Sequence, residues 1–219
     1  MAVEILTADQ ISLLTAIGHH PIISKKFYLS GGTALAGFYL YHRYSEDLDF
    51  FSESEVDPTA IQIFFRGLKK KLAIQTIDFQ QSFNRNLFFL HLPSGILKTE
   101  FTYFPFPPIE QGLVQYDVRV DSLLDIAVNK LFTIYQRTQA RDYIDLYCIC
   151  QKQNYAITDL IKQAKIKFDW HIDPIQLGTQ FTKAQSAPDH PRMITNIDPQ
   201  AWQDFFIQEA ERLHSEVLR

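Results

Sequence analysis

Two glycines placed between a strand-like run and a helix-like run, followed by two aspartates, constrain the fold of this chain most strongly. The segment, residues 28–51, reads YLSGGTALAGFYLYHRYSEDLDFF. Glycines let the backbone approach a phosphate closely because they carry no Cβ atom. Asp47 and Asp49 are two residues apart in a strand pattern, so both side chains project from one face. The segment predicts a mixed α/β domain that could hold a nucleotide through phosphate and divalent cations.

The glycine pair, Gly31 and Gly32, has two interpretations. It precedes a predicted helix whose free N–H groups and positive dipole end favour an anion, and Ser30 or Thr33 could add a hydroxyl donor. The alternative is an ordinary strand-to-helix turn, because glycines commonly mark turns. The pattern matches neither a Walker loop, whose lysine is absent here, nor the G-x-G-x-x-G fingerprint.

Asp47 and Asp49 also have two interpretations, a metal-binding pair or the solvated face of a strand. Leu48 and Phe50 alternate with them, which a half-buried strand explains without any function. Repulsion among crowded carboxylates destabilises a fold unless a cation neutralises them, and Arg43 is the one basic residue between positions 26 and 66. Aspartate is disfavoured in strands, and carboxylates about 6.6 Å apart can flank paired metal ions. The crowded acidic residues are Glu46, Asp47, Asp49, Glu53, Glu55 and Asp57.

Glu100 is the candidate for a third carboxylate. It lies in a strand-like run, residues 97–103, in which Lys98, Glu100 and Thr102 share one face. That face could simply be solvated. If this strand lies beside the strand that carries the aspartates, Glu100 becomes a third metal ligand or a general base.

Hydrophobic periodicity predicts a mixed α/β first half and a helical second half. Helices are expected at residues 7–17, 33–42 and 58–72, the last with Asp57 as its cap and Pro58 at its first position. Strands are expected at residues 26–30, 47–51, 73–80, 86–92 and 97–106. Further helices are expected at residues 121–136, 141–151, 158–168, 173–183 and 198–218. The predicted boundary, near residues 107–120, separates a first domain at residues 1–118 from a helical domain at residues 119–219.

Composition and charge narrow the classes of function. The 219 residues are 46% hydrophobic, which allows a substantial core, and the net charge is −4. Because neither half is strongly basic, a polyanionic substrate would be met by local positive sites or through a metal. The sequence contains no membrane-length apolar run and no signal-peptide pattern, so we expect a cytoplasmic protein without a membrane partner.

Other common catalytic patterns find no match in the sequence. The seven histidines form no HxxxH or HxxE set, which disfavours zinc-dependent hydrolysis. No G-x-S-x-G elbow is present, and Cys148 is better explained as a core residue than as a nucleophile. Cys148 and Cys150 diverge around a predicted helix, so neither a disulfide nor a metal pair between them is expected.

A second segment, residues 121–146, supplies candidate positive charge. Lys130 lies outside the apolar stripe of the predicted helix and could reach across a cleft. A solvated lysine is the commoner case, but a nucleoside triphosphate needs positive charge beyond its metal ions. Arg141 and Asp145, at positions i and i+4, could form an ordinary helix pair, whereas Asp142 points elsewhere.

Together the two segments resemble the nucleotidyltransferase toxins of the AbiEii/AbiGii type, members of the DNA polymerase β-like nucleotidyltransferase superfamily. The first segment carries the glycine pair and HR-x-S-x-D-x-D, and the second carries a helical lysine, an arginine and [KR]-D-x-x-D-L. The matching positions of the second segment are Lys130, Arg137, Arg141, Asp142 and Asp145. The resemblance implies an α+β fold, in which a polymerase β-like core of short mixed sheet and flanking helices precedes a C-terminal helical domain that closes over the nucleotide.

The resemblance also implies a reaction, the metal-dependent transfer of a nucleoside monophosphate from an NTP to an acceptor hydroxyl. Asp47, Asp49 and Glu100 are the implied ligands of Mg²⁺ or Mn²⁺, and Lys130 and Asp142 complete the implied catalytic set. Asp142 would orient Lys130 or Arg137. The nucleotide-binding residues are expected to be Gly31, Gly32, Thr33, Arg43 and Lys130.

The same resemblance implies biological partners. It suggests a toxin with a cognate antitoxin protein and an RNA acceptor such as a tRNA 3′ end. A non-catalytic NTP-binding or interaction protein that keeps this fold is the alternative, and metal-dependent phosphoester hydrolysis is a more distant one.

Overall fold

The computed structural model describes residues 5–217, and the chain divides into two compact units. Unit 1 comprises Met1–Tyr39, Ser45–Pro107 and Gln111–Ser122, and unit 2 comprises Leu40–Tyr44, Pro108–Glu110 and Leu123–Arg219. Two short segments, residues 40–44 and 108–110, thus belong to unit 2 although their neighbours in sequence belong to unit 1. The division into domains at residues 1–118 and 119–219 stays a prediction.

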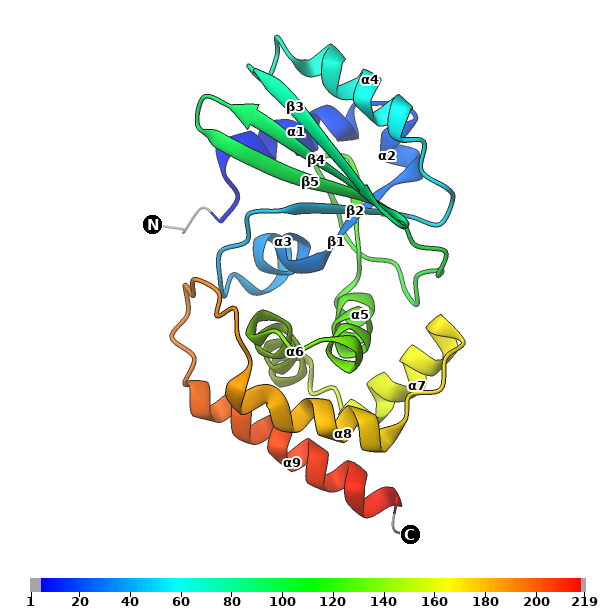
Figure 1. Cartoon of the computed structure of the whole chain (residues 1–219), viewed down its shortest axis with the longest axis vertical. Helices are drawn as coiled ribbons and strands as arrows, with labels where there is room; N and C mark the ends of the chain where they lie inside the picture. Colours follow the sequence, from blue (N-terminus) through cyan, green and yellow to red (C-terminus); the bar gives the residue numbers. More distant parts are fainter. Residues whose placement is uncertain (1–4, 218–219) are drawn as a thin grey trace. The chain divides into compact units, whose positions relative to one another are not determined.

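Unit 1 is built on a mixed sheet that has seven strands within the described residues, in the order β3-β4-β5-β2-β1-β7-β6. The central strand β2 runs parallel to β5 and antiparallel to β1, and β1 runs parallel to β7. Figure 1 shows β3, β4 and β5 as the long strands of this sheet. The strands are β1 (Tyr28–Ser30), β2 (Leu48–Ser52), β3 (Thr76–Ser82), β4 (Arg85–Leu92), β5 (Gly95–Tyr103), β6 (Val114–Gln115) and β7 (Val118–Val120).

The helices of unit 1 begin where the sequence provides caps. Thr7 forms a capping box with Gln10 at the start of α1, and Asp57 accepts the N–H groups of Thr59 and Ala60 at the start of α4. The glycine pair begins α3, which continues as a π-helical turn, η1. The helical elements of this unit are α1 (Ala8–Gly18), α2 (Ile23–Lys26), α3 (Gly31–Leu35), η1 (Ala36–Leu40) and α4 (Pro58–Leu68).

Aromatic side chains form the centre of the unit 1 core. Phe50 of β2 stacks on Phe101 of β5 with ring centroids 5.0 Å apart, and Phe65 of α4 packs edge-on against Phe101. Phe50, Phe65, Phe88 and Phe101 are fully buried. Because the rings of Phe50 and Phe101 lie on one face of β2 and β5, Asp49 and Glu100 lie on the other face.

Unit 2 is helical, as expected for the second half of the chain. Tyr143 of α6 packs against Trp202 and Phe206 of α9, and all three side chains are buried. Figure 1 shows α8 lying along α9. The helices are α5 (Leu123–Gln136), α6 (Ala140–Gln153), α7 (Ile157–Phe168), α8 (Pro174–Thr182), the 3₁₀ turn η2 (Lys183–Ser186) and α9 (Pro199–Val217). Among residues 5–217, no helix combines the length and apolar character that crossing a membrane requires.

The expected elements differ from the structure mainly at their ends and in the shortest pieces. The strand expected at residues 26–30 starts at Tyr28 because Lys26 still belongs to α2. The strand expected at residues 97–106 ends at Tyr103, just before Pro105, which has no N–H to donate. The helix expected to begin at Thr33 begins at Gly31. Strands β6 and β7, of two and three residues, were not predicted because so short a run shows no periodicity.

Candidate functional site

Two candidate carboxylates lie side by side in the sheet of unit 1. The parallel register of β2 and β5 pairs Asp49 with Glu100, and Asp47 directly precedes β2. Leu48 and Phe50 are fully buried, which sends the intervening Asp49 to the opposite face. The structure thus meets the condition on which the interpretation of Glu100 depended, because its strand is the neighbour of the aspartate strand.

Basic side chains hold two of these carboxylates. Lys98 Nζ lies 2.5 Å from Asp47 Oδ2. Arg85 donates two hydrogen bonds to Glu100, from Nε to Oε1 at 2.7 Å and from Nη2 to Oε2 at 2.5 Å, and Thr102 donates to Oε1. Burial alone would raise the pKa of Glu100, but the hydrogen bonds from Arg85 and Thr102 outweigh it and lower this pKa below its ordinary value. Glu100 is therefore ionised at neutral pH.

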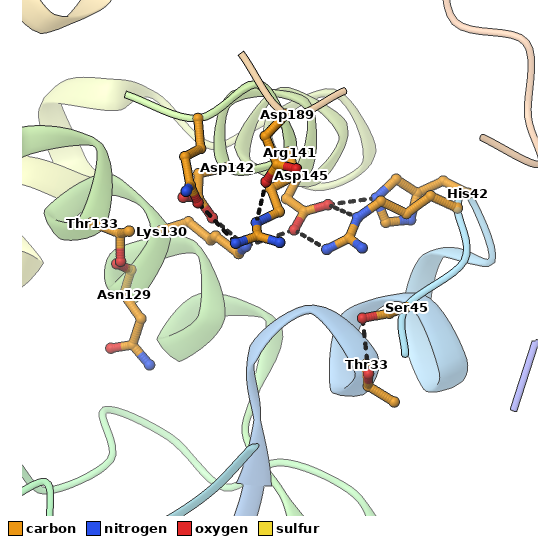
Figure 2. A network of polar contacts seen from close by, with 12 residues as sticks. Thr33, His42, Ser45, Asn129, Lys130, Thr133, Arg141, Asp142, Asp145 and Asp189 are labelled. Atoms are coloured by element: carbon orange, nitrogen blue, oxygen red, sulfur yellow. Dashed lines mark hydrogen bonds and ion pairs between the residues drawn. The ribbon is translucent and has the colours of Figure 1, made fainter. Parts of the chain in front are cut away.

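The glycine turn lies directly against one of the carboxylates. Gly31 has φ +74°, in the left-handed region, and a Cβ atom added there would lie 2.5 Å from Asp49 Oδ2. Only glycine leaves room for this carboxylate. The Thr33 hydroxyl contacts the Asp47 carbonyl oxygen and lies 2.8 Å from Ser45 Oγ, as Figure 2 shows for the hydroxyl pair. The turn and both aspartates therefore form one local structure in unit 1.

The hydroxyl of Ser30, the other donor considered for this turn, is already engaged. Ser30 Oγ donates to Asp121 Oδ2 at 2.7 Å, and both residues are buried. Both hydroxyls are thus engaged by protein groups, that of Thr33 within the aspartate segment and that of Ser30 at Asp121.

A divalent cation fits the chemistry of this face of the sheet. Asp47, Asp49 and Glu100 offer carboxylate oxygens, the donors that Mg²⁺ and Mn²⁺ prefer, and Gly31 leaves space beside Asp49 that a Cβ would fill. Within residues 5–217, three or more acidic, histidine or cysteine side chains do not gather closely enough to hold a metal in the present arrangement. A cation on this face would therefore have to compete with the Lys98 and Arg85 side chains.

Unit 2 contains a buried network of charges centred on α5 and α6. Lys130 Nζ lies 2.7 Å from Asp142 Oδ1 and 2.7 Å from Asp145 Oδ2. Arg137 donates from Nε and Nη2 to Asp142 Oδ2, at 3.2 and 3.0 Å. Figure 2 shows Lys130 of α5 pointing toward Asp142 and Asp145 of α6. Asp142 thus contacts both basic residues that it was expected to orient.

Asp145 accepts three further hydrogen bonds from the segment at residues 40–44. Arg43 donates from Nε and Nη2 at 2.7 and 2.8 Å, and His42 Nε2 lies 2.8 Å from Asp145 Oδ1. Arg43 is itself buried, and its third donor group reaches the Tyr44 carbonyl oxygen at 2.9 Å. Each guanidinium nitrogen of Arg43, which was expected to bind nucleotide, therefore donates to a protein group in this structure.

The two aspartates of α6 are held in their charged forms. Burial opposes ionisation of both, but the charges of Lys130 and Arg43 hold the pKa of Asp145 well below its ordinary range. Lys130 and Arg137 lower the pKa of Asp142 in the same way. The positive charges of the network therefore outweigh the effect of burial on the ionisation of both carboxyl groups.

Asp145 was expected to match the family motif and to form a helix pair with Arg141, but the structure gives Arg141 and Asp145 different partners. Arg141 Nε lies 3.2 Å from Asp189 Oδ2 (Figure 2). Asp145 is fully buried and its oxygens are occupied by Lys130, Arg43 and His42. The spacing of Asp142 and Asp145 could have predicted that both contact Lys130, because residues three apart on a helix share one face.

Sequence reasoning also missed a second buried carboxylate in unit 2. Asp125 of α5 accepts the backbone N–H groups of Ile109 and Glu110 at 2.8 and 3.2 Å, and Lys167 of α7 lies 2.6 Å away. Asp125 therefore secures residues 108–110, as Asp145 secures residues 40–44. Each segment that unit 2 takes from the first half of the chain is thus held by a buried aspartate.

The cysteines of α6 are free thiols in a poor environment for nucleophilic chemistry. Burial raises the pKa of both Cys148 and Cys150 to about 12, so each stays protonated at neutral pH. Because the thiolate is the nucleophilic form of cysteine, neither side chain is suited to act as a nucleophile.

Comparison with known proteins places this arrangement in a family. The model of the family described as "Nucleotidyl transferase AbiEii toxin, Type IV TA system" matches residues 13–214. The chain is also 32% identical over 148 residues to the uncharacterized protein aq_aa25 of Aquifex aeolicus (strain VF5), which covers 67% of this chain and 68% of that protein.

Solved structures share the fold. MenT4, the nucleotidyltransferase toxin Rv2826c of Mycobacterium tuberculosis H37Rv, has a TM-score of 0.62 at 16% identity, covering 94% of this chain and 81% of that chain. JHP933 from Helicobacter pylori has a TM-score of 0.58 at 20% identity, covering 94% and 88%. These likenesses confirm the predicted fold class, and the family match over most of the sequence shows that the chain belongs to the AbiEii nucleotidyltransferase toxin family.

Proposed function

We propose that this protein transfers a nucleoside monophosphate from an NTP to an acceptor hydroxyl in a metal-dependent reaction. The acceptor oxygen forms a bond to the α-phosphorus, the bond between the α- and β-phosphates breaks, and pyrophosphate leaves with the bonding electrons. The acceptor hydroxyl loses its proton to a base. The observation that carries the proposal is the pairing of Asp49 with Glu100, next to Asp47 and against the turn at Gly31. Membership of the AbiEii family supports it.

Unit 1 would supply the carboxylates and the phosphate turn. Asp47, Asp49 and Glu100 would hold Mg²⁺ or Mn²⁺, which supplies positive charge that stabilises the transferring phosphoryl group. The lowered pKa of Glu100 makes it a weak base at neutral pH and favours the ligand role over the general-base role. Gly31 and Gly32, together with Thr33, would place backbone N–H groups and little side-chain bulk next to the phosphates.

Unit 2 would supply fixed positive charge. Lys130 uses two of its three ammonium hydrogens on Asp142 and Asp145, which leaves one for a phosphate oxygen. Asp142 would act by holding Lys130 in place. We propose that Arg43 serves nucleotide binding through Asp145, because Arg43 fixes the carboxylate that holds Lys130.

The family description supports a biological role as well. The family is described as a toxin of a type IV toxin–antitoxin system, and we propose that this protein is such a toxin, with a cognate antitoxin protein as its partner. The proposed acceptor is an RNA hydroxyl, such as the 3′ end of a tRNA. The proposed place of action is the cytoplasm, where NTPs and RNA are both available.

The test is a label-transfer assay. The protein is incubated with each of the four α-labelled NTPs, Mg²⁺ and total RNA, beside an Asp47→Ala, Asp49→Ala double variant. A matched control, Glu53→Gln with Glu55→Gln, removes two exposed carboxylates from the same acidic segment. We expect transfer by the wild type and by the control, and none by the double aspartate variant.

Two results would contradict the proposal in different ways. Transfer by the double aspartate variant would overturn the metal assignment. Transfer by neither protein, with NTP binding that survives the replacement of Asp47 and Asp49, would support the alternative of a non-catalytic NTP-binding protein. The ion pairs of Lys98 and Arg85 are the observation that favours this alternative, because they already neutralise two of the carboxylates.

A further inference from the structure

The charges of unit 2 form an alternating chain with a surplus of positive charge. In order of contact, the chain runs from Arg137 to Asp142, Lys130, Asp145 and Arg43. Because both ends are cations, three positive charges face two negative ones. A proton on His42, which also contacts Asp145, would only increase the surplus. The network therefore carries a net positive charge, which attracts an anion.

The ends of the chain differ in their access to solvent. The Arg43 side chain is 5% exposed and its donors are engaged by Asp145 and Tyr44. The Arg137 side chain is 47% exposed, whereas that of Asp142, its partner, is 1% exposed. The guanidinium uses Nε and Nη2 on Asp142, and within the described residues Nη1 makes no hydrogen bond. An anion from solvent can therefore meet the surplus charge at Arg137.

Asp142 also prepares the Arg137 guanidinium for binding. Two hydrogen bonds to a buried oxygen fix the plane of the group, so less side-chain freedom is lost when a ligand binds. A planar guanidinium with free N–H groups suits phosphate oxygens, which it can contact through two parallel hydrogen bonds. The Arg137 guanidinium is therefore preorganised for binding, unlike the side chain of a freely moving surface arginine.

We propose that Arg137 is a binding residue for the phosphate groups of the NTP, positioned by Asp142. The inference rests on the proposed function, and it names the group of unit 2 that contacts the triphosphate alongside Lys130. A triphosphate concentrates several negative charges in a compact group, which one positioned guanidinium can engage. An RNA backbone spreads its charges and requires several cations along its length, whereas Arg141, the nearest arginine in sequence, is paired with Asp189.

The test compares arginine variants by isothermal titration calorimetry. Arg137→Gln removes the charge, and Arg137→Lys keeps it without the planar donor set. Arg212→Gln is the matched control, because the Arg212 side chain is likewise exposed, at 66%, and is paired with a buried acid, Glu209. The probes are the four NTPs with Mg²⁺, inorganic tripolyphosphate, and a single-stranded RNA without a 5′ triphosphate.

We expect Arg137→Gln to weaken the binding of every NTP and of tripolyphosphate by about 10-fold or more. Arg137→Lys should retain part of the affinity, and Arg212→Gln should match the wild type. RNA binding should be the same in all variants. The melting temperature of each variant shows whether a loss reflects unfolding, and Arg137→Lys keeps the test valid if Arg137→Gln is unstable.

The outcomes separate this inference from the proposed function. Wild-type label transfer with an unchanged KM for NTP in Arg137→Gln would overturn the inference and leave the function standing. A loss confined to RNA would also overturn it. Loss of tripolyphosphate binding in Arg137→Gln, in a protein that transfers no label, would support the phosphate site and contradict the transferase.

Discussion

The ion pairs that hold the candidate residues differ in solvent exposure between the two units. In unit 1 the pair of Lys98 with Asp47 is partly exposed on both sides, at 31% and 37%. In unit 2 Asp142 and Asp145 are at most 1% exposed, and Lys130 is 10% exposed. The Lys98–Asp47 pair of unit 1 can thus exchange its partner, whereas the pairs of Lys130 with Asp142 and Asp145 in unit 2 are permanent.

This difference indicates a division of labour. A partly exposed ion pair such as Lys98–Asp47 contributes about 0–1 kcal/mol, so a metal ion can displace the lysine at little cost. Removing one member of a buried pair costs about 3–5 kcal/mol because the other member is left charged and desolvated. Unit 1 is therefore suited to binding and releasing a cation, whereas unit 2 is suited to presenting charge from a fixed position.

The largest effect is expected when the central carboxylate of unit 2 is neutralised. Asp145→Asn leaves Lys130 and Arg43 without their shared buried partner, so we expect the free energy of unfolding to fall by about 3–5 kcal/mol. The control is Asp47→Asn, which removes a half-exposed pair and should cost about 1 kcal/mol or less. Urea denaturation of both variants at neutral pH measures the difference. Equal losses would break the comparison between the two units.

The pH dependence of stability should follow the same carboxylates. The pKa values of Asp145 and Asp142 are below the ordinary value of 3.8, and that of Glu100 is below 4.5. A depressed folded-state pKa contributes stability above the unfolded value, and this contribution is lost as pH falls through the folded value. We expect a constant free energy of unfolding above about pH 5 and a steep fall below it.

Urea denaturation at a series of pH values between neutral and about pH 3 tests this dependence. The slope below about pH 4 should be shallower for Asp145→Asn than for the wild type, because one depressed carboxyl is missing. A wild-type protein whose stability does not change across this range would show that the network is not held in its charged form.

Much of unit 1 could be predicted because its signals are local. Alternation around Asp49, the cap at Asp57 and the glycine turn each depend on residues close in sequence, and the structure has each element where it was expected. The pairing of β2 with β5 could not be predicted, since about 50 residues separate the strands and register depends on the whole sheet. Glu100 could be identified only as a carboxylate on one face of a predicted strand, without knowledge of the neighbouring strand.

Unit 2 shows what local patterns cannot provide. The helices follow from apolar periodicity, but the partners of Asp145 come from residues 40–44, about 100 positions away. Asp125 likewise binds backbone N–H groups at residues 109 and 110, which carry no sequence signature. A buried polar network depends on contacts between residues far apart in sequence. Its residues could therefore be predicted, but the hydrogen bonds and ion pairs between them could not.

Substituting Gly31 in the glycine turn should reduce label transfer as well as stability, which backbone strain alone would not explain. In Gly31→Ala, φ of +74° costs about 1–2 kcal/mol and the new Cβ collides with the Asp49 carboxylate, so we expect lower stability and a large loss of label transfer. Gly95→Ala is the matched control, because Gly95 has φ +140° and open space where a Cβ would be. It should lose stability and keep transfer. Full transfer by Gly31→Ala would show that the Asp49 carboxylate need not lie against the turn.

The smallest effect on stability, and the sharpest test of exchangeable partners, is expected from Lys98→Met. The Lys98 pair with Asp47 is partly exposed, so its loss should change the free energy of unfolding by about 1 kcal/mol or less. Removing a positive charge next to a carboxylate strengthens the attraction of that carboxylate for a cation. The Mg²⁺ concentration that gives half-maximal label transfer should therefore fall severalfold.

The control is Lys162→Met, which breaks an exposed pair with Asp159 in unit 2 and should leave this Mg²⁺ concentration unchanged. If Lys98→Met instead raised the Mg²⁺ requirement, Lys98 would be part of the site rather than a partner that the metal displaces.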